Sequence, residues 1–551
     1  MLVLALPLVL ATFDAREATI SSTHHALFTG LATCREVVSS FLSRIEAFNN
    51  ETNAIISLNP RALEIADEYD GEIQRNHGSY GSLFCVPTLL KDNYDTADMR
   101  TTGGSVALRE SQPTLDAPAV KVLKDSGAII IGKANLHELA LEGLSVSSLG
   151  GQTMNPYDRT RTPGGSSGGT GAAIAASFAV WGTGTDTVNS LRSPASANGL
   201  FSCRPTRGLI SRSGVIPISY TQDVLGPIGR CVKDIAVALT VMAGTPYDPS
   251  DNATALVPSG IRGSDFSQGL TQGSLEGLRF GLLEGFFNRT VSDETDPVNQ
   301  AMANMTAKLQ AAGATIIPIT DEMYNATAIA SLDTQRYEFR ESLDAYLQRP
   351  SLSGSHPTTT NELYTSDGYL VIPAQYEYVN TALLSSTANT TTTTTTTSTT
   401  KPSYATIMSR IHNLTLALHA TLVENRLDAL LYPEQKNLVV KIGSPSQSGR
   451  NGILAALTGT PVVTVPVGFS AATEDAPEGV PIGMEILGSA WTEGKLLQIA
   501  SHIERLGRVR RSPRWALESV EVKEYLQDVP VIVPDAGNVN LQAYPLGTLH
   551  V

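Results

Sequence analysis

The sequence predicts an α/β protein whose sheet is covered by helices, and three observations support this fold class. From about residue 80 to 240, short apolar runs alternate with helical patterns, which is typical of strand–helix–strand units around a buried sheet. The same alternation returns from about residue 425. Apolar residues make up 42% of the chain and charged residues 17%, so a sizeable core is available and wholesale disorder is excluded.

The elements follow from local patterns, taken in chain order. Residues 22–75 are expected to be helical, with apolar side chains at helical spacing from Val37 to Ile45 and a break at Asn49-Asn50. Asp116 is expected to cap a helix that has Pro118 in its first turn and that ends at Gly127. The apolar segments 128–131, 427–433 and 460–468 are expected to be strands, and 496–506 a helix.

The chain is expected to form one domain over residues 20–515, with a low-complexity insertion at 385–402 and a C-terminal tail at 516–551. The insertion contains an unbroken threonine run from Thr390 to Thr397. Such a tract cannot bury apolar surface, so a solvated loop is expected. The tail is punctuated by Pro and Gly and is expected to wrap the surface or fray.

Residues 1–15 are expected to be a signal peptide. Leu2 to Ala11 is apolar and of suitable length, and Val9 and Ala11 suit a cleavage site, although no Lys or Arg precedes them. Seven N-x-Ser/Thr sequons fit a secretory route: Asn50, Asn252, Asn288, Asn304, Asn325, Asn389 and Asn413. We therefore expect a secreted glycoprotein, with a cytoplasmic location as the alternative.

Charge and cysteine content exclude several classes. A formal net charge of −14 disfavours nucleic-acid and anionic-membrane partners, and no apolar run in the sequence is long enough for a membrane span. Four cysteines cannot form a disulfide scaffold at this length; they allow three pairings or free thiols, and the sequence does not choose. Histidines show no metal-ligand spacing, because His137-Glu138 lacks the second histidine of a zinc helix. The sequence does not indicate an oligomeric state.

The informative region runs from residue 86 to 230. The loop 164–169 reads GGSSGG, and it lacks both the Lys of a phosphate-binding loop and the spacing of a dinucleotide fingerprint. A tight structural turn is the alternative interpretation of such a loop. The apolar run VPTLLKD delivers Lys91, and the turn GTDTVNSLRSPA holds Ser190 among small residues.

Together these three segments resemble the amidase signature family. The likeness continues through residues 204–208, 222–227, 460–468 and 481–485 and covers most of residues 25–510. The resemblance implies a single α/β/α domain around a large, mixed, mostly parallel twisted sheet. It implies no metal or organic cofactor, and a small-molecule or peptide amide as substrate.

The resemblance also implies the site residues. It assigns Ser190 as nucleophile, Ser166 as a bridge that follows a cis peptide bond after Gly165, and Lys91 as base; Thr187, Val188, Asn189 and Ser190 as the oxyanion hole; and Ser167, Asp186 and Arg192 as supporting residues. The physical logic agrees, because a serine hydroxyl needs an aligned base and a lysine serves as base only when burial lowers its pKa. Ser167 is expected to support Lys91, and Asp186 with Arg192 to pin the turn, against a surface ion pair as the alternative.

One position departs from the family pattern, because Val188-Asn189 replaces the usual Gly-Gly. Valine resists a left-handed backbone, so either the turn avoids positive φ there or the oxyanion hole is shaped differently. If the family geometry is kept, the bulk of Val188 should restrict the acyl group. If the turn is rearranged, the Asn189 side-chain amide should itself donate to the oxyanion.

The sequence thus predicts an amidohydrolase that cleaves a carboxylic amide to an acid and an amine or ammonia through a seryl acyl-enzyme. Two alternatives stay open: the glutaminase subunit of a tRNA-dependent amidotransferase, and a catalytically inactive binding protein with the same fold. The sequence does not name the amide.

Overall fold

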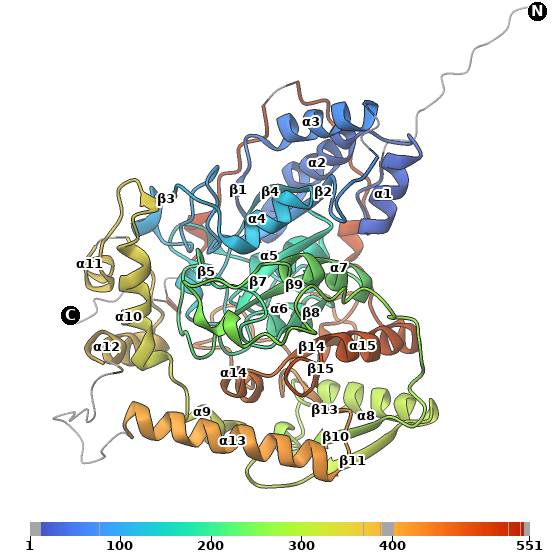
Figure 1. The fold of residues 1–551 in the computed structure, drawn as a ribbon, viewed down its shortest axis with the longest axis vertical. Coiled ribbons are helices and arrows are strands. Elements are labelled where there is room, and N and C mark those ends of the chain that lie inside the picture. The colour runs from blue at the N-terminus through green and yellow to red at the C-terminus, as the bar shows by residue number, and fades with distance from the viewer. Residues whose placement is uncertain are drawn as a thin grey trace, which may run out of the picture.

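The computed structural model describes residues 13–75, 78–366, 368–385, 387, 402–526, 528–539 and 542–544. Most of the expected signal peptide and of the threonine tract lies outside these residues. Figure 1 shows the elements arranged around one long twisted sheet, with the first helices at one end and the pair β10 and β11 at the other.

The main sheet has 11 strands in the order β1-β4-β2-β7-β9-β8-β14-β15-β13-β10-β11. Its strands are β1 (Ile55–Leu58), β2 (Val86–Lys91), β4 (Ala128–Ala134), β7 (Trp181–Asp186), β8 (Phe201–Arg204), β9 (Val224–Gly229), β10 (Arg279–Leu283), β11 (Thr315–Ile319), β13 (Ala429–Pro433), β14 (Val462–Phe469) and β15 (Pro481–Leu487). Two small sheets pair β3 (Gln112–Pro113) with β12 (Leu352–Ser353) and β5 (Val146–Ser147) with β6 (Gly151–Gln152). The predicted large mixed sheet is confirmed.

Parallel pairing does not predominate, however, and that detail of the expectation is wrong. The strands β4, β2 and β7 pair in parallel, as do β13, β10 and β11. From β7 through β9, β8, β14 and β15 to β13 every pair is antiparallel, as is β1 with β4. Parallel neighbours need a long crossover connection, whereas β14 and β15 are joined by a loop without a helix.

The sheet lies between two rows of helices. In one row α4, α7, α15 and α8 contact each other in series, and in the other α2, α5 and α6 do. The helices are α1 (Ile20–Phe28), α2 (Cys34–Thr52), α3 (Ala62–Gln74), α4 (Pro118–Asp125), α5 (Gly168–Ala175), α6 (Arg192–Ala197), α7 (Val232–Met242), α8 (Asp296–Ala311), α9 (Ala326–Ala330), α10 (Gln335–Leu347), α11 (Thr360–Thr365), α12 (Tyr376–Leu384), α13 (Tyr404–Glu424), α14 (Ile453–Thr458) and α15 (Glu493–Gly507). Every residue of α5 is buried, which explains its run of Gly and Ala.

A second group of helices lies beside the sheet. Figure 1 shows α10, α11 and α12 together at one side of the molecule and α9 and α13 along an adjacent edge. The threonine tract joins α12 to α13, so both of its ends belong to this group. Among the described residues, no helix combines the length and the apolar character needed to cross a membrane.

Two local expectations near the N-terminal half are wrong. Helix α2 continues past Asn49-Asn50 to Thr52, because the Asn49 side chain accepts hydrogen bonds from the N–H groups of Ala54 and Ile55 beyond the helix end. Residues 22–75 also include strand β1, which joins the sheet.

The start of helix α4 also differs from the expectation. Asp116 does not cap α4, because its carboxylate accepts from the Ala97 N–H and from Lys124 instead. Pro118 and Gly127 occupy the expected positions at the two ends of this helix, and Gly127 has a φ of 85°.

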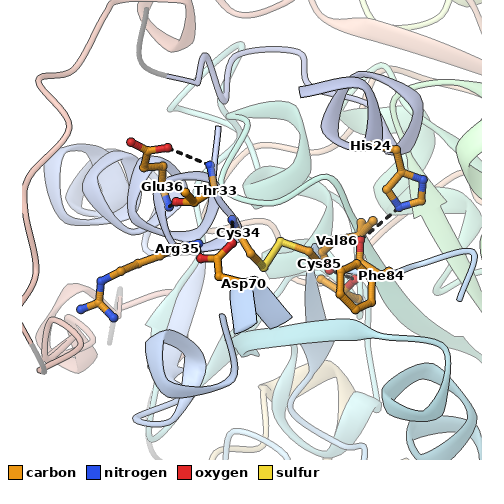
Figure 2. The surroundings of a disulfide bond; sticks show 10 residues. His24, Thr33, Cys34, Arg35, Glu36, Asp70, Phe84, Cys85 and Val86 are labelled. Atoms are coloured by element: carbon orange, nitrogen blue, oxygen red, sulfur yellow. Dashed lines mark hydrogen bonds between the residues drawn. A yellow bond between two sulfur atoms is a disulfide. The ribbon is translucent and has the colours of Figure 1, made fainter. Parts of the chain in front are cut away.

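A disulfide bond between Cys34 and Cys85 joins the start of α2 to the residue before β2 (Figure 2). The first turn of α2 is fixed by a capping box between Thr33 and Glu36 and by Asp70, which accepts from the Cys34 N–H at 2.6 Å. The other two cysteines are free: Cys203 is buried and Cys231 is partly buried. The bond therefore braces the beginning of the strand that ends at Lys91.

Candidate active site

The carboxyl ends of two neighbouring strands define the site. Strand β2 ends at Lys91, and β7 ends at Asp186, from which the chain turns through Ser190 into α6. Because β2 and β7 pair in parallel, their carboxyl ends lie at the same edge of the sheet, where α/β enzymes bind their substrates. The pairing thus brings together two segments that are about a hundred residues apart.

Lys91 is fully buried and has only neutral hydrogen-bond partners. Its Nζ donates to Ser166 Oγ at 2.7 Å and to Thr185 Oγ1 at 2.8 Å. No described carboxylate forms an ion pair with it. Burial therefore lowers the pKa of Lys91 to about 7, and the more distant negative charges of Asp186 and Asp223 oppose this shift only in part. An amine with this pKa is available as a base near neutral pH.

Ser166 lies in the glycine-rich loop that precedes α5, and the peptide bond from Gly165 to Ser166 is cis, as expected. The glycines of this loop permit close packing. A Cβ at Gly168 would lie 2.1 Å from Ser145 Oγ, and one at Gly169 would lie 2.2 Å from the Asn135 carbonyl oxygen. The loop is therefore a tightly packed turn that presents Ser166 to Lys91.

The nearest histidine does not compete with Lys91 for the role of base. The backbone N–H of His137 donates to the Ser166 carbonyl oxygen at 3.0 Å, so this residue lies next to the site. Burial lowers the pKa of its imidazole to about 4. A base this weak is poorly matched to proton abstraction from a serine hydroxyl.

The turn that precedes the nucleophile differs from both simple expectations. Among residues Thr187 to Ser190, all of them described, none has a positive φ, so Val188 is not strained. The Asn189 side chain is buried, and its Nδ2 donates to Glu434 Oε1 at 3.1 Å. Because that amide is engaged with Glu434, we abandon its role as an oxyanion donor. The turn avoids left-handed backbone at position 188, and the backbone N–H groups remain the candidate donors.

Asp186 and Arg192 are fully buried, so the alternative of a surface ion pair is wrong. The guanidinium of Arg192 donates to both carboxylate oxygens of Asp186, to Glu485 at 2.7 Å and to the Val188 carbonyl oxygen. Arg204 donates to Asp186 at 2.8 Å from the other side. These charges fix the turn from behind, because Asp186 also accepts from the Leu191 N–H at 3.0 Å.

Ser167 supports Lys91 less directly than expected. Its hydroxyl donates to the Thr185 carbonyl oxygen at 3.4 Å, and Thr185 in turn contacts Lys91. The residue that sequence reasoning missed is therefore Thr185, together with Thr183, whose Oγ1 accepts from the Lys91 N–H at 3.2 Å. Their spacing of two along one strand was the available signal, because residues at i and i+2 face the same side of a sheet.

Two more residues with contacts to the turn were missed. The Gln222 side chain donates to the Thr187 carbonyl oxygen at 3.1 Å and accepts from the Thr334 N–H at 2.8 Å, which ties the turn to the start of α10. Asp223 accepts from Thr187 Oγ1 at 2.6 Å. It also lines a surface cavity of about 470 Å³, which brings the surface close to the turn. No local pattern in the sequence indicates which distant segment these side chains contact.

The comparisons with known proteins agree over most of the chain. The Amidase family model matches residues 36–497. A probable amidase from Arabidopsis thaliana is 31% identical over 92% of this chain and 93% of its own length. A glutamyl-tRNA(Gln) amidotransferase subunit from Synechococcus sp. (strain CC9605) is 30% identical over 92% of this chain and 99% of its own length.

Solved structures show the same fold. The peptide amidase from Stenotrophomonas maltophilia is 30% identical, with a TM-score of 0.74 over 90% of this chain and 98% of that one. A structure of the peptide amidase PAM in complex with the competitive inhibitor chymostatin has a TM-score of 0.76 over 91% of this chain.

Proposed function

The chain belongs to the amidase family and is an amide-hydrolysing enzyme, and from this premise we propose that it uses Ser190 as nucleophile, Ser166 as proton bridge and Lys91 as base. The products are a carboxylic acid and an amine or ammonia. The observation that carries this proposal is the contact of 2.7 Å between Lys91 Nζ and Ser166 Oγ in a fully buried site without a counter-ion. There the amine is neutral enough to accept a proton at physiological pH.

Protons and bonds balance at each step. Lys91 takes the proton of Ser166 as Ser166 takes that of Ser190, and Ser190 Oγ forms a bond to the amide carbon while the C=O π pair moves to oxygen. The tetrahedral intermediate collapses, the C–N bond breaks, and Ser166 returns a proton to the leaving nitrogen as Lys91 gives its own back. Water then attacks the acyl-enzyme with the same pair as base, and Ser190 leaves with a proton.

The negative oxygen of the intermediate needs hydrogen-bond donors that are fixed in advance. We assign this role to backbone N–H groups of residues 187–190. The packing of Arg192 and Gln222 against carbonyl groups of the same turn supports the assignment, because a turn whose carbonyls are engaged has little freedom to rotate its N–H groups. Loss of one such donor lowers kcat by roughly a hundredfold or more in other hydrolases.

For the substrate we propose a peptide-type amide. Structures that bear the name peptide amidase are similar to this chain over nine-tenths of its length. The test is a hydrolysis screen of the purified protein with C-terminal peptide amides, aliphatic amides, aryl amides and glutamine. Peptide amides should give the highest kcat/KM, and a preference of more than tenfold for any other class would contradict the substrate proposal.

A glutaminase subunit of a tRNA-dependent amidotransferase is the second candidate, because proteins with that kind of name match nearly their whole length to this chain. The disulfide bond argues against it, since such bonds persist in oxidising compartments and translation does not take place there. Efficient hydrolysis of glutamine only in the presence of partner proteins would favour this second candidate.

We also propose that the protein is exported and N-glycosylated. The disulfide supports this, and so do the sequon asparagines: Asn50, Asn252, Asn304, Asn325 and Asn413 are exposed, Asn288 is half-exposed, and Asn389 lies outside the described residues. Expressed in a eukaryotic host, the protein should accumulate in the medium and migrate faster after enzymatic removal of N-glycans. Retention inside the cell with unmodified asparagines would contradict the proposal.

Ser190→Ala tests the mechanism itself. This variant should lose amide hydrolysis and labelling by a serine-directed fluorophosphonate while it unfolds at the same temperature as the parent. A catalytically inactive binding protein would not label even with Ser190 present. Near-normal turnover by Ser190→Ala would show that the nucleophile is misassigned.

The pH dependence tests the base. Lysine acts as base in its neutral form, so a pKa of about 7 means that kcat/KM should fall about tenfold per pH unit below pH 7 and level off above it. The measurement is kcat/KM from pH 5 to 8 on one good substrate. The same acid limb in Lys91→Ala would exclude Lys91 as its origin.

A further inference from the structure

Behind the nucleophile turn lies a cluster of five ionisable side chains with no exposed surface. They are Asp186 on β7, Arg192 on α6, Arg204 on β8, Glu434 directly after β13, and Glu485 on β15. Two of these side chains are guanidinium groups and three are carboxyl groups. Their charges therefore cancel only when one carboxyl group is protonated, which matters because a net charge is costly without water.

Glu434 is the carboxyl group with the fewest partners. Asp186 contacts both guanidinium groups, and Glu485 pairs with Arg192 at 2.7 Å. Glu434 has no ion pair among the described residues, and its Oε1 accepts only from Asn189 Nδ2. Its Oε2 is buried with no hydrogen-bond partner among those residues. A buried oxygen in this state is far less costly as part of a neutral carboxyl group than of a carboxylate.

The backbone of Glu434 is held firmly in place. Its N–H donates to the Gly483 carbonyl oxygen on β15 at 3.1 Å, and its own carbonyl oxygen accepts from the Asn451 N–H at 3.0 Å. The side chain of Glu434 is thus a fixed point, and its partner Asn189 directly precedes Ser190. Asn189 also stands where the family usually has glycine, so the contact with Glu434 gives that side chain a role.

We propose that Glu434, in its neutral form, is a positioning residue that holds Asn189 and thereby the turn that carries Ser190, and that its ionisation disables this turn. The proposal rests on the proposed function, because it concerns the same nucleophile. It adds a residue outside the triad and the oxyanion hole that controls the alkaline limit of the reaction.

The charges around Glu434 make its ionisation consequential. Burial raises the pKa of Glu434 to about 8, and the charges of Glu485 and Asp186 raise it further, while the Asn189 hydrogen bond and Arg192 oppose the shift. Arg204 faces Asp186 from β8, and burial raises the pKa of Tyr432 on β13, so Tyr432 stays neutral over this range. Ionised Glu434 therefore adds one unbalanced negative charge beside the turn where the oxyanion forms.

The expected pH profile is a bell. Activity rises as Lys91 becomes neutral at about pH 7 and falls as Glu434 becomes charged at about pH 8. Like charges repel, so an ionised Glu434 disfavours the negative intermediate as well as the geometry of the turn. The two limbs belong to different residues and can be removed separately.

The test is Glu434→Gln, which keeps the shape and an acceptor oxygen but cannot ionise. The ratio of kcat/KM at pH 9.5 to that at pH 7.5 should rise by roughly tenfold or more over the parent, because the falling limb is lost. Glu504→Gln is the matched control, since Glu504 on α15 also has a pKa raised to about 7 by burial but contacts α7. The control should keep the profile of the parent.

A falling limb that survives unchanged in Glu434→Gln overturns the inference. If Glu434→Gln does not fold, Asn189→Ala provides the second measurement, since it removes the contact and leaves Glu434 in place. Its kcat should fall roughly tenfold with little change in KM, and a parental kcat would count against the inference. Failure of the mechanism is distinguishable, because it appears as an active Ser190→Ala enzyme whatever the alkaline limb does.

Discussion

Two buried clusters on either side of the nucleophile turn solve opposite problems. The cluster of Lys91, Ser166 and Thr185 contains one ionisable group and only neutral partners. The cluster of Asp186, Arg192, Arg204 and Glu485 contains paired charges with several hydrogen bonds each. Both clusters are excluded from water almost completely.

The difference shows how burial can serve either reactivity or rigidity. Burial without a counter-ion disfavours the charged form of Lys91 and makes it a base. Burial with a counter-ion keeps Arg192 charged, because Asp186 and Glu485 raise its pKa despite desolvation. A substitution in the first cluster should therefore affect catalysis, and one in the second should affect stability as well.

The largest effect should come from Lys91→Met, which keeps a long side chain but removes the base. We expect kcat to fall on the order of 10⁴-fold. The free energy of unfolding should change by less than about 1 kcal/mol, because no buried ion pair is broken. Steady-state kinetics and urea unfolding measure the two quantities. A large loss of stability would mean that Lys91 is charged and paired, which would remove the contrast between the clusters.

The second effect is on stability. Arg192→Met leaves the carboxylates of Asp186 and Glu485 without a shared partner, and breaking a buried pair in this way costs about 3–5 kcal/mol of unfolding free energy. The matched control is Lys121→Met, whose exposed pair with Asp125 on α4 should contribute less than about 0.5 kcal/mol. Equal losses in urea unfolding for the two variants would contradict the role of burial.

A smaller effect is expected where the ionic cluster meets the turn. A Cβ at Gly452 would lie 2.3 Å from the Val188 carbonyl oxygen and 2.5 Å from Asn189 Cβ. Gly452→Ala should therefore displace the turn, lower stability by about 1–3 kcal/mol and lower kcat with it. Gly260→Ala is the control, because no atom lies within 4 Å of its Cβ position and its φ is not positive. Kinetics of both variants on one substrate decide the point.

The smallest effect should come from Val188→Gly. Val188 is half-buried against the apolar cluster that includes Phe286, and its φ is not positive, so glycine relieves no strain. We expect a wider range of branched acyl groups and a modest loss of rate on the best substrate from added backbone freedom. An unchanged acyl profile in a series of amides would show that the Val188 side chain does not line the acyl pocket.

Much of the fold could be predicted from the chain. The strands at 429–433 and 462–469 and the helix at 493–507 lie within a few residues of their expected places, because their apolar periodicity is strong. The direction of the central strands could not, since alternation within a strand does not reveal its neighbour. The reach of Asn49 beyond the end of α2 is likewise a contact between separate segments.

By itself the sequence determined the family and the candidate triad, because Lys91, Ser166 and Ser190 lie in local motifs whose order survives in one dimension. It also determined that position 188 is unusual. Only the tertiary structure decided what surrounds these residues. Thr185, Gln222 and Glu434 come from separate parts of the chain and act through contacts that strand pairing creates. The pKa of Lys91 and that of Glu434 were decided in the same way, since desolvation and the distance to other charges exist only after the chain has folded.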